Sequence, residues 1–169
     1  MADLVTHMAT GLLLKAAAGT RHTPTLLLGV VLPDLAGRVP VVVGLAVVNQ
    51  GVPLPDLVVY GWGVLHVPLG MVAMCFLLCQ VFADRRGAFL HLFGGCMLHL
   101  ALDVFQFHTG SGYPLLFPFS RWHWELGLIS TEATVPWSLP LALIAGLLWG
   151  LRRRREASLL VQDRQPHTG

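Results

Sequence analysis

Residues 57–83 read LVVYGWGVLHVPLGMVAMCFLLCQVFA and contain no Lys, Arg, Asp or Glu. A helix that crosses the hydrocarbon core of a bilayer needs about 17 to 25 mostly apolar residues, so this stretch is long enough to span a membrane. Two further charge-free stretches, residues 87–102 and 133–151, approach or reach that length. The pattern predicts several membrane-spanning helices.

The composition of the chain agrees with a membrane location. Hydrophobic residues make up 54% of the 169 residues, charged residues make up 12%, and the mean hydropathy is +0.66. These values lie well on the apolar side of soluble globular proteins. We therefore expect an all-α, polytopic membrane bundle with about four to six membrane-embedded helices. The sequence predicts one embedded domain over residues 1–151, followed by a basic tail over residues 152–169.

Arginine clusters predict the orientation of the bundle. Residues 152–155 are all arginine and follow the last apolar stretch, and Arg85 and Arg86 separate the two stretches before it. An excess of positive charge marks cytoplasmic flanks, so both clusters predict the same side of the cell membrane and a cytoplasmic C-terminus. In a prokaryote this would be the inner membrane. We expect the arginines to meet anionic membrane lipids, and we expect no nucleic-acid partner.

The same preference of positive charge for the cytoplasmic side assigns the individual helices and loops to their positions in the membrane. Helices are expected near residues 65–82, 88–107 and 135–151, which leaves residues 108–134 as an external loop. The first third is less regular, because the apolar runs at residues 4–18 and 25–32 are short. The sequence PDLAGR, residues 33–38, is expected to break the second run. Residues 39–48 would then form a further short or re-entrant helix.

Six polar residues fall near the expected external ends of these helices. His99 and Asp103 lie four residues apart in an apolar run, so on a helix they share one face. Because both groups are costly to bury in hydrocarbon, a bound cation is a better explanation than a stray polar pair. The complete candidate set is His7, Asp34, His66, His99, Asp103 and His108. Imidazoles combined with carboxylates suit a divalent transition metal, most simply zinc.

Other interpretations of these residues stay open. His99 and Asp103 could form a hydrogen-bonded pair without a metal, and Asp34 could cap the helix that follows it. His7 and His66 could lie in the headgroup zone. The segment Arg121–Glu125, with two tryptophans, is typical of an interfacial anchor, although Glu125 and His108 remain candidates for the site.

The order of these elements resembles a known family. A His near the N-terminus, LPD at residues 32–34, the HLALD segment at residues 99–103 and the GSGYPLLFPFS loop at residues 110–120 are similar to the membrane-bound, metal-dependent hydrolases of the LexA-regulated YdjM-like group. A more distant similarity is to zinc-dependent phospholipase C. The chain departs from the family pattern at residues 61–66, where GWGVLH replaces a His-Arg-Gly-x-x-His element. Arg38 and Arg121 are possible substitutes for the missing cation.

The resemblance implies a function for the candidate residues. Asp34, His66, His99 and Asp103 would be the first metal ligands, and His7 and His108 would bind a second ion or support the first. A metal-activated water would hydrolyse an ester, with Asp34 or Glu125 orienting that water. The substrate class that fits this location is a lipid-type ester or phosphoester.

Two other functions compete with hydrolysis. The same His and Asp residues could relay protons or pass a metal ion across the membrane without catalysis. Two of the histidines could instead bind haem or a quinone, although the nearby carboxylates suit a hydrolytic ion better.

Overall fold

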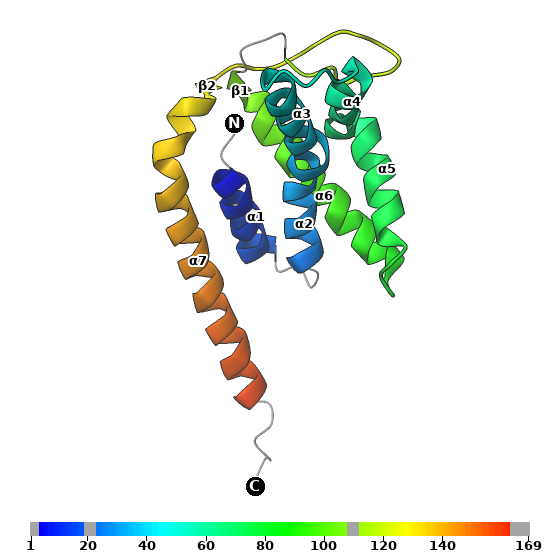
Figure 1. Ribbon diagram of the computed structural model, residues 1–169. Coiled ribbons are helices and arrows are strands. Elements are labelled where there is room, and N and C mark those ends of the chain that lie inside the picture. The colour runs from blue at the N-terminus through cyan, green and yellow to red at the C-terminus, as the bar shows by residue number, and fades with distance from the viewer. Residues whose placement is uncertain (1–3, 19–22, 108–111, 163–169) are drawn as a thin grey trace, which may run out of the picture.

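Helices make up nearly all of the secondary structure in the computed structural model, which describes residues 4–18, 23–107 and 112–162 (Figure 1). The elements in chain order are α1 (Leu4–Ala18), α2 (Thr23–Pro33), the π-helix η1 (Asp34–Arg38), α3 (Val39–Asn49), α4 (Asp56–Tyr60), the 3₁₀-helix η2 (Gly61–His66), α5 (Pro68–Cys79), α6 (Arg85–Phe105), β1 (Gln106–Phe107), β2 (Ile129–Ser130) and α7 (Thr131–Gln162). The prediction of an all-α bundle is confirmed. The two short strands pair in parallel and tie the end of α6 to the start of α7.

Three helical segments in the described residues are long and apolar enough to cross a membrane: Thr23–Asn49, Arg85–Phe105 and Glu132–Arg155. A fourth span is possible if the bent pair Asp56–His66 and Pro68–Cys79 crosses as one unit. The apolar helix Leu4–Ala17 is shorter than these. The described residues thus contain three such spans, or four with the bent pair, against the expected four to six membrane-embedded helices.

The segment Pro33–Arg38 does not break the second apolar run, contrary to the prediction. Helix α2 passes through η1 into α3, and the N–H of Val39 donates to the carbonyl of Asp34, five residues earlier. Pro33 has no N–H, so the regular helical ladder is interrupted there. The chain absorbs this interruption by widening into one π-turn, a feature that often lies at functional sites. Residues 39–49 thus continue the same helical segment and do not form a separate one.

The long charge-free stretch that suggested a span is bent. The segment Asp56–His66 and helix α5 meet at an angle of 81°, and helix α5 begins only at Pro68, not near Leu65. Val67, between them, has an extended backbone with φ −107° and ψ 159°. The helical region is sterically disfavoured for a residue before a proline, and Val67 precedes Pro68, which favours a turn here. His66, the last residue of η2, is consequently buried next to the bend.

Helices α2 and α6 pack so closely that glycine is required at their contact. A Cβ atom on Gly29 would lie 2.1 Å from the carbonyl oxygen of Leu92, and one on Gly95 would lie 2.3 Å from that of Leu26. Small residues that let backbones approach are the usual contact between membrane helices. On the other side of α6, a buried apolar cluster that includes Met71, Cys75 and Cys96 joins α5 to α6.

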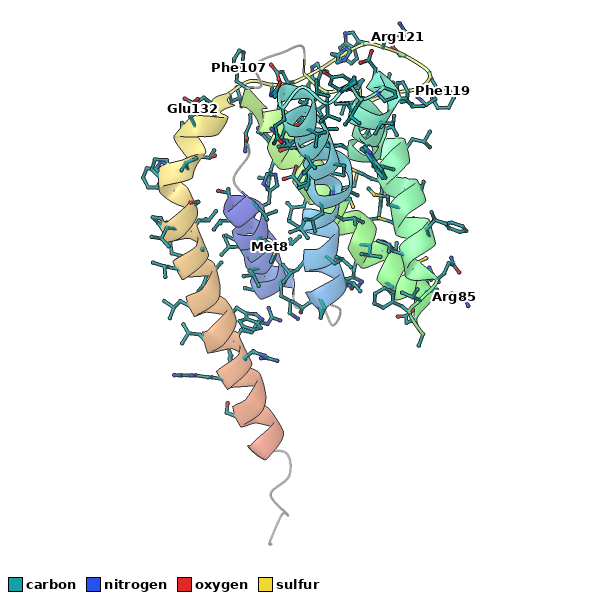
Figure 2. The ribbon with its side chains drawn as sticks, viewed as in Figure 1. Met8, Arg85, Phe107, Phe119, Arg121 and Glu132 are labelled. Atoms are coloured by element: carbon teal, nitrogen blue, oxygen red, sulfur yellow. The ribbon has the colours of Figure 1, made fainter. Side chains whose placement is uncertain are left out.

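The two ends of the bundle differ in chemistry. Arg85 lies at one end of the bundle (Figure 2). The opposite end holds Phe107, Phe119, Arg121 and Glu132. Helix α7 does not stop at residue 151 but continues through the arginine cluster to Gln162. There Arg152 donates a hydrogen bond to the carbonyl of Ala16, at the end of α1. The C-terminus of α1, the start of α6 and the arginines of α7 thus share the end opposite the loop.

Candidate metal centre

Five of the six predicted ligands come together from four elements. His7 lies on α1, Asp34 begins η1, His66 ends η2, and His99 and Asp103 lie on α6. His7, His99 and Asp103 have no exposed surface, and Asp34 and His66 are each 7% exposed. His108 lies outside the described residues.

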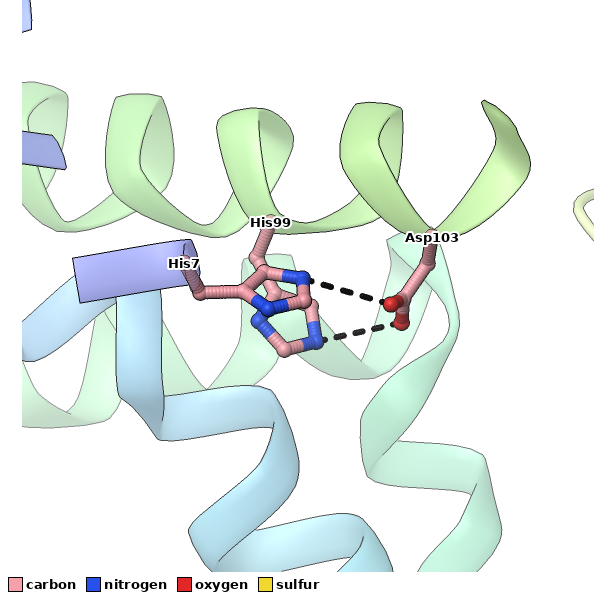
Figure 3. Close-up of side chains that lie close together, drawn as sticks. All are labelled: His7, His99 and Asp103. Atoms are coloured by element: carbon pink, nitrogen blue, oxygen red, sulfur yellow. Dashed lines mark ion pairs between the residues drawn. The ribbon is translucent and has the colours of Figure 1, made fainter. Parts of the chain in front are cut away.

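His7 and His99 approach the carboxylate of Asp103 together (Figure 3). Nε2 of His7 is 3.3 Å from Oδ1 of Asp103, and Nε2 of His99 is 3.2 Å from Oδ2. The two imidazole rings lie beside each other, with centroids 4.2 Å apart. The i, i+4 spacing on α6 places His99 and Asp103 on one face, as predicted. Asp103 therefore offers one oxygen to each histidine.

His66 and Asp34 complete the cluster from the opposite side. Nε2 of His66 lies 3.0 Å from Nε2 of His99, 3.4 Å from Oδ2 of Asp103 and 3.5 Å from Oδ1 of Asp34. Gly37 makes this approach possible, because a Cβ there would lie 3.0 Å from the Cβ of His66. The π-turn supplies Asp34 and Gly37 together, so the irregular helix positions this half of the cluster.

The spacing of the ligand atoms fits a first-row metal ion. Such an ion holds nitrogen and oxygen ligands at about 2.0–2.2 Å, which separates neighbouring ligands by about 3.0 Å at right angles and about 3.4 Å at tetrahedral angles. The pairs among His66, His99, Asp34 and Asp103 that lie in contact are 3.0, 3.2, 3.4, 3.5 and 3.8 Å apart. Two groups of buried side chains could each hold an ion: Asp34 with His66 and His99, and His7 with His99 and Asp103.

The charge of the cluster also favours a cation. Within the described residues, Asp34 and Asp103 have no Lys or Arg in ion-pair distance, and their ion-pair partners are histidines. Oδ1 of Asp34 is buried and accepts no hydrogen bond from the described part of the chain. Two carboxylates in a buried, apolar setting are costly unless positive charge compensates them. A divalent ion among the five side chains would provide that charge.

Two contacts orient the ligands from outside the cluster. Nδ1 of His99 lies 2.7 Å from the carbonyl oxygen of Val30, and the hydroxyl of Tyr113 donates to Oδ2 of Asp103 at 2.9 Å. The Tyr113 ring also stacks on His66, with centroids 5.4 Å apart. Burial, and then the neighbouring Asp103 carboxylate, raise the pKa of the Tyr113 phenol well above its usual range, so the hydroxyl remains a donor at neutral pH. Neither contact was predicted from the sequence, although Tyr113 lies within the loop that carries the family resemblance.

The remaining predicted residues lie in the loop that covers this end. Tyr113 forms an antiparallel bridge with Trp124, and Glu125 follows directly and is half-buried. Among the described residues, the two groups that could hold a metal do not include Glu125. Its role in orienting water stays a prediction. Trp122 and Trp124 are 58% and 38% exposed, as an interfacial anchor requires.

Comparison with known protein families gives a match. The family model described as YdjM inner membrane protein matches residues 1–162 of the chain. No curated protein and no solved structure matches it. The matched region contains every described residue of the cluster and all the helices long enough to span a membrane.

Proposed function

This chain belongs to the YdjM inner membrane protein family, and from that premise we propose that it is a membrane-bound, metal-dependent hydrolase. The observation that supports the proposal best is the buried cluster of three histidines and two aspartates, whose ligand atoms are spaced as a metal ion requires. Ionisable side chains are rare within membrane segments, and where they occur they usually mark functional sites.

His66, His99, Asp34 and Asp103 are the proposed first ligands, and zinc is the proposed metal. Mixed imidazole and carboxylate donors are typical of catalytic zinc, whereas calcium and magnesium prefer oxygen ligands only. His7 contacts the other oxygen of Asp103, which suits it to support that carboxylate or to bind a second ion.

A bound metal would supply a Lewis acid and a water molecule acidified toward neutral pH. The side chains of the protein would accept the proton and position the metal ligands. Asp34 is the more accessible of the two carboxylates, so it is suited to accept the proton of the attacking water, with Glu125 as the alternative base. Hydrolysis then joins the water oxygen to the phosphorus or acyl carbon, and the leaving oxygen takes up a proton. Tyr113 and the Val30 carbonyl hold Asp103 and His99 in place throughout.

The position of the cluster favours hydrolysis over transport. A carrier of protons or metal ions needs polar groups through the whole membrane thickness. Below the cluster, however, the contact between α5 and α6 is built of apolar residues and cysteines such as Met71, Leu92 and Cys96. A one-sided centre can receive a substrate from the bilayer without opening a path through it. A lipid-type ester or phosphoester is therefore the proposed substrate.

The proposal is tested on the detergent-purified full-length chain. Metal content is measured by mass spectrometry, and hydrolysis is assayed on lipid phosphomonoesters, phosphodiesters and carboxyl esters in mixed micelles. Asp103→Asn should lower both the metal retained and the hydrolysis, because it removes a charged ligand and preserves the shape. Asp56→Asn, at an exposed aspartate outside the cluster, should change neither. An unchanged metal content in Asp103→Asn, or a metal-loaded parent that hydrolyses none of these lipids, would contradict the proposal.

A further inference from the structure

Arg38 lies beside the candidate metal centre and has no hydrogen-bond or ion-pair partner among the described residues. It is the last residue of η1, one helical turn after Asp34, and it is half-buried. Arg38 also belongs to the segment Thr23–Asn49, which is long and apolar enough to span a membrane. A guanidinium at such a place costs free energy unless an anion compensates it, so its position calls for an anionic ligand.

A hollow in the surface of the same helical segment connects Arg38 with the metal centre. It has a volume of 80 Å³ and is lined by Asp34, Arg38, Val39, Val42 and Val43. This space holds several water-sized groups, and hence part of an acyl chain but not a whole lipid. Its exposed surface is entirely apolar, and Asp34 and Arg38 border it with their carbon atoms. The rest of the lining lies along α3, where Val39, Val42 and Val43 are 41%, 47% and 55% exposed.

We propose that Arg38 binds the phosphate of an anionic lipid substrate, whose acyl chain lies over Val39, Val42 and Val43. The hollow suits the acyl chain of such a molecule because its surface is entirely apolar. Arg38, a cation at the other end of η1 from Asp34, lies at its border, where a phosphate attached to that chain can reach it. Arginine suits this role because its planar donors match two phosphate oxygens at once. The inference rests on the proposed hydrolase function and narrows it, since it selects lipid phosphoesters over neutral carboxyl esters.

The same assignment fits the packing of residues 61–66. In this chain GWGVLH forms η2, and a Cβ on Gly37 would lie 3.3 Å from the carbonyl oxygen of Trp62. This segment therefore packs directly against η1. Arg38, on η1, is a cation close to that segment, whereas Arg121 lies in an exposed part of the covering loop (Figure 2).

The test measures binding and metal content separately. Phosphatidic acid, diacylglycerol and water-soluble glycerol phosphate are titrated against the metal-loaded, full-length protein in neutral detergent. Arg38→Gln should weaken the binding of phosphatidic acid about tenfold or more, as expected for the loss of a charged hydrogen bond, and should leave the metal content unchanged. Arg38→Lys should recover part of the affinity. Arg86→Gln, at the opposite end of the bundle, is the control.

A second pair of variants tests whether the hollow binds the acyl chain. Val42→Trp should fill it and weaken phosphatidic acid binding, whereas Val48→Trp, on the same helix but outside the lining, should not. Parental phosphatidic acid affinity in Arg38→Gln would overturn the assignment of Arg38. Glycerol phosphate binding as tight as that of phosphatidic acid would overturn the lipid source. If the parent protein does not retain the added metal, by contrast, that result would count against the hydrolase proposal and not against the role of Arg38.

Discussion

The Nδ1 atom of His99 on α6 lies 2.7 Å from the carbonyl oxygen of Val30 on α2. A carbonyl can only accept, so Nδ1 must carry a proton and donate it, and in a neutral ring Nε2 is then left with its lone pair. That lone pair faces His66 and Asp103. The close contact of α2 with α6, made possible by Gly29 and Gly95, thus sets the protonation of the central candidate ligand as well as the packing.

Nitrogen NMR of the reconstituted, metal-free protein should find His99 protonated at Nδ1. Adding zinc should then shift the Nε2 signal of His99, because this atom becomes a ligand. His91 is the matched control on the same helix: its Nδ1 also lies 2.7 Å from a backbone carbonyl, that of Gly87, but it is absent from the groups that could hold a metal. It should keep its signals when zinc is added. A His99 that carries its proton on Nε2 and none on Nδ1 in the metal-free protein would contradict the arrangement.

Tyr113→Phe should weaken metal binding by about 10-fold to 100-fold, the usual effect of losing a partner that orients a ligand. The variant removes the hydrogen bond to Asp103 but retains the ring that stacks on His66. Thermal stability without metal should therefore change little. Competition with a chelating dye measures the affinity, and Tyr60→Phe, an exposed tyrosine outside the cluster, serves as the control. Equal affinity in Tyr113→Phe and the parent would show that the hydroxyl does not position Asp103.

The sequence predicted the parts of this cluster that depend on helix periodicity. His99 and Asp103 could be paired because four residues make about one turn of any helix. Asp34 and His66 had to be grouped by a topology argument and by resemblance, because their contact depends on a π-turn and a bend that no periodicity reveals. Tyr113 was missed for a related reason. Its contact with Asp103 depends on how a loop folds back over the helix ends, and an isolated tyrosine carries no pattern.

The break expected at residues 33–38 shows that a proline by itself does not determine whether a membrane helix ends. Pro33 removes one N–H, and in water that usually ends a helix. In a membrane the chain gains by keeping its other backbone groups bonded, so a local widening costs less than an end. The sequence thus located the irregularity correctly but not its form, and that form brings Asp34 toward His66.

Gly95→Ala should destabilise the bundle by about 1–3 kcal/mol, the usual cost of forcing a methyl group into a closely packed contact. Its Cβ would lie 2.3 Å from the carbonyl oxygen of Leu26, so α2 and α6 would have to separate. Gly94→Ala is an unusually close control, because no described atom lies within 4 Å of its added Cβ. It should be neutral or slightly stabilising, as alanine favours helix. Denaturation in mixed detergent micelles measures both variants, and equal midpoints would contradict the observed contact.

Replacing Arg153 and Arg154 by glutamate should disturb the orientation of the chain without touching the metal centre. Both residues lie on α7, where Arg153 stacks on Trp149 at 4.8 Å, and the neighbouring Arg152 bonds to Ala16. Their end of the bundle is opposite the one that holds Asp103 and the covering loop (Figure 2).

Since positive charge is retained in the cytoplasm, the parent should place a C-terminal reporter there and the cluster near the outer surface. Paired fusions to a fluorescent protein and to alkaline phosphatase measure the side directly, and the Arg153→Lys, Arg154→Lys variant should behave as the parent because its charge is unchanged. An external C-terminus in the parent would instead turn the centre toward the cytoplasm, and a substrate would then have to come from the inner leaflet.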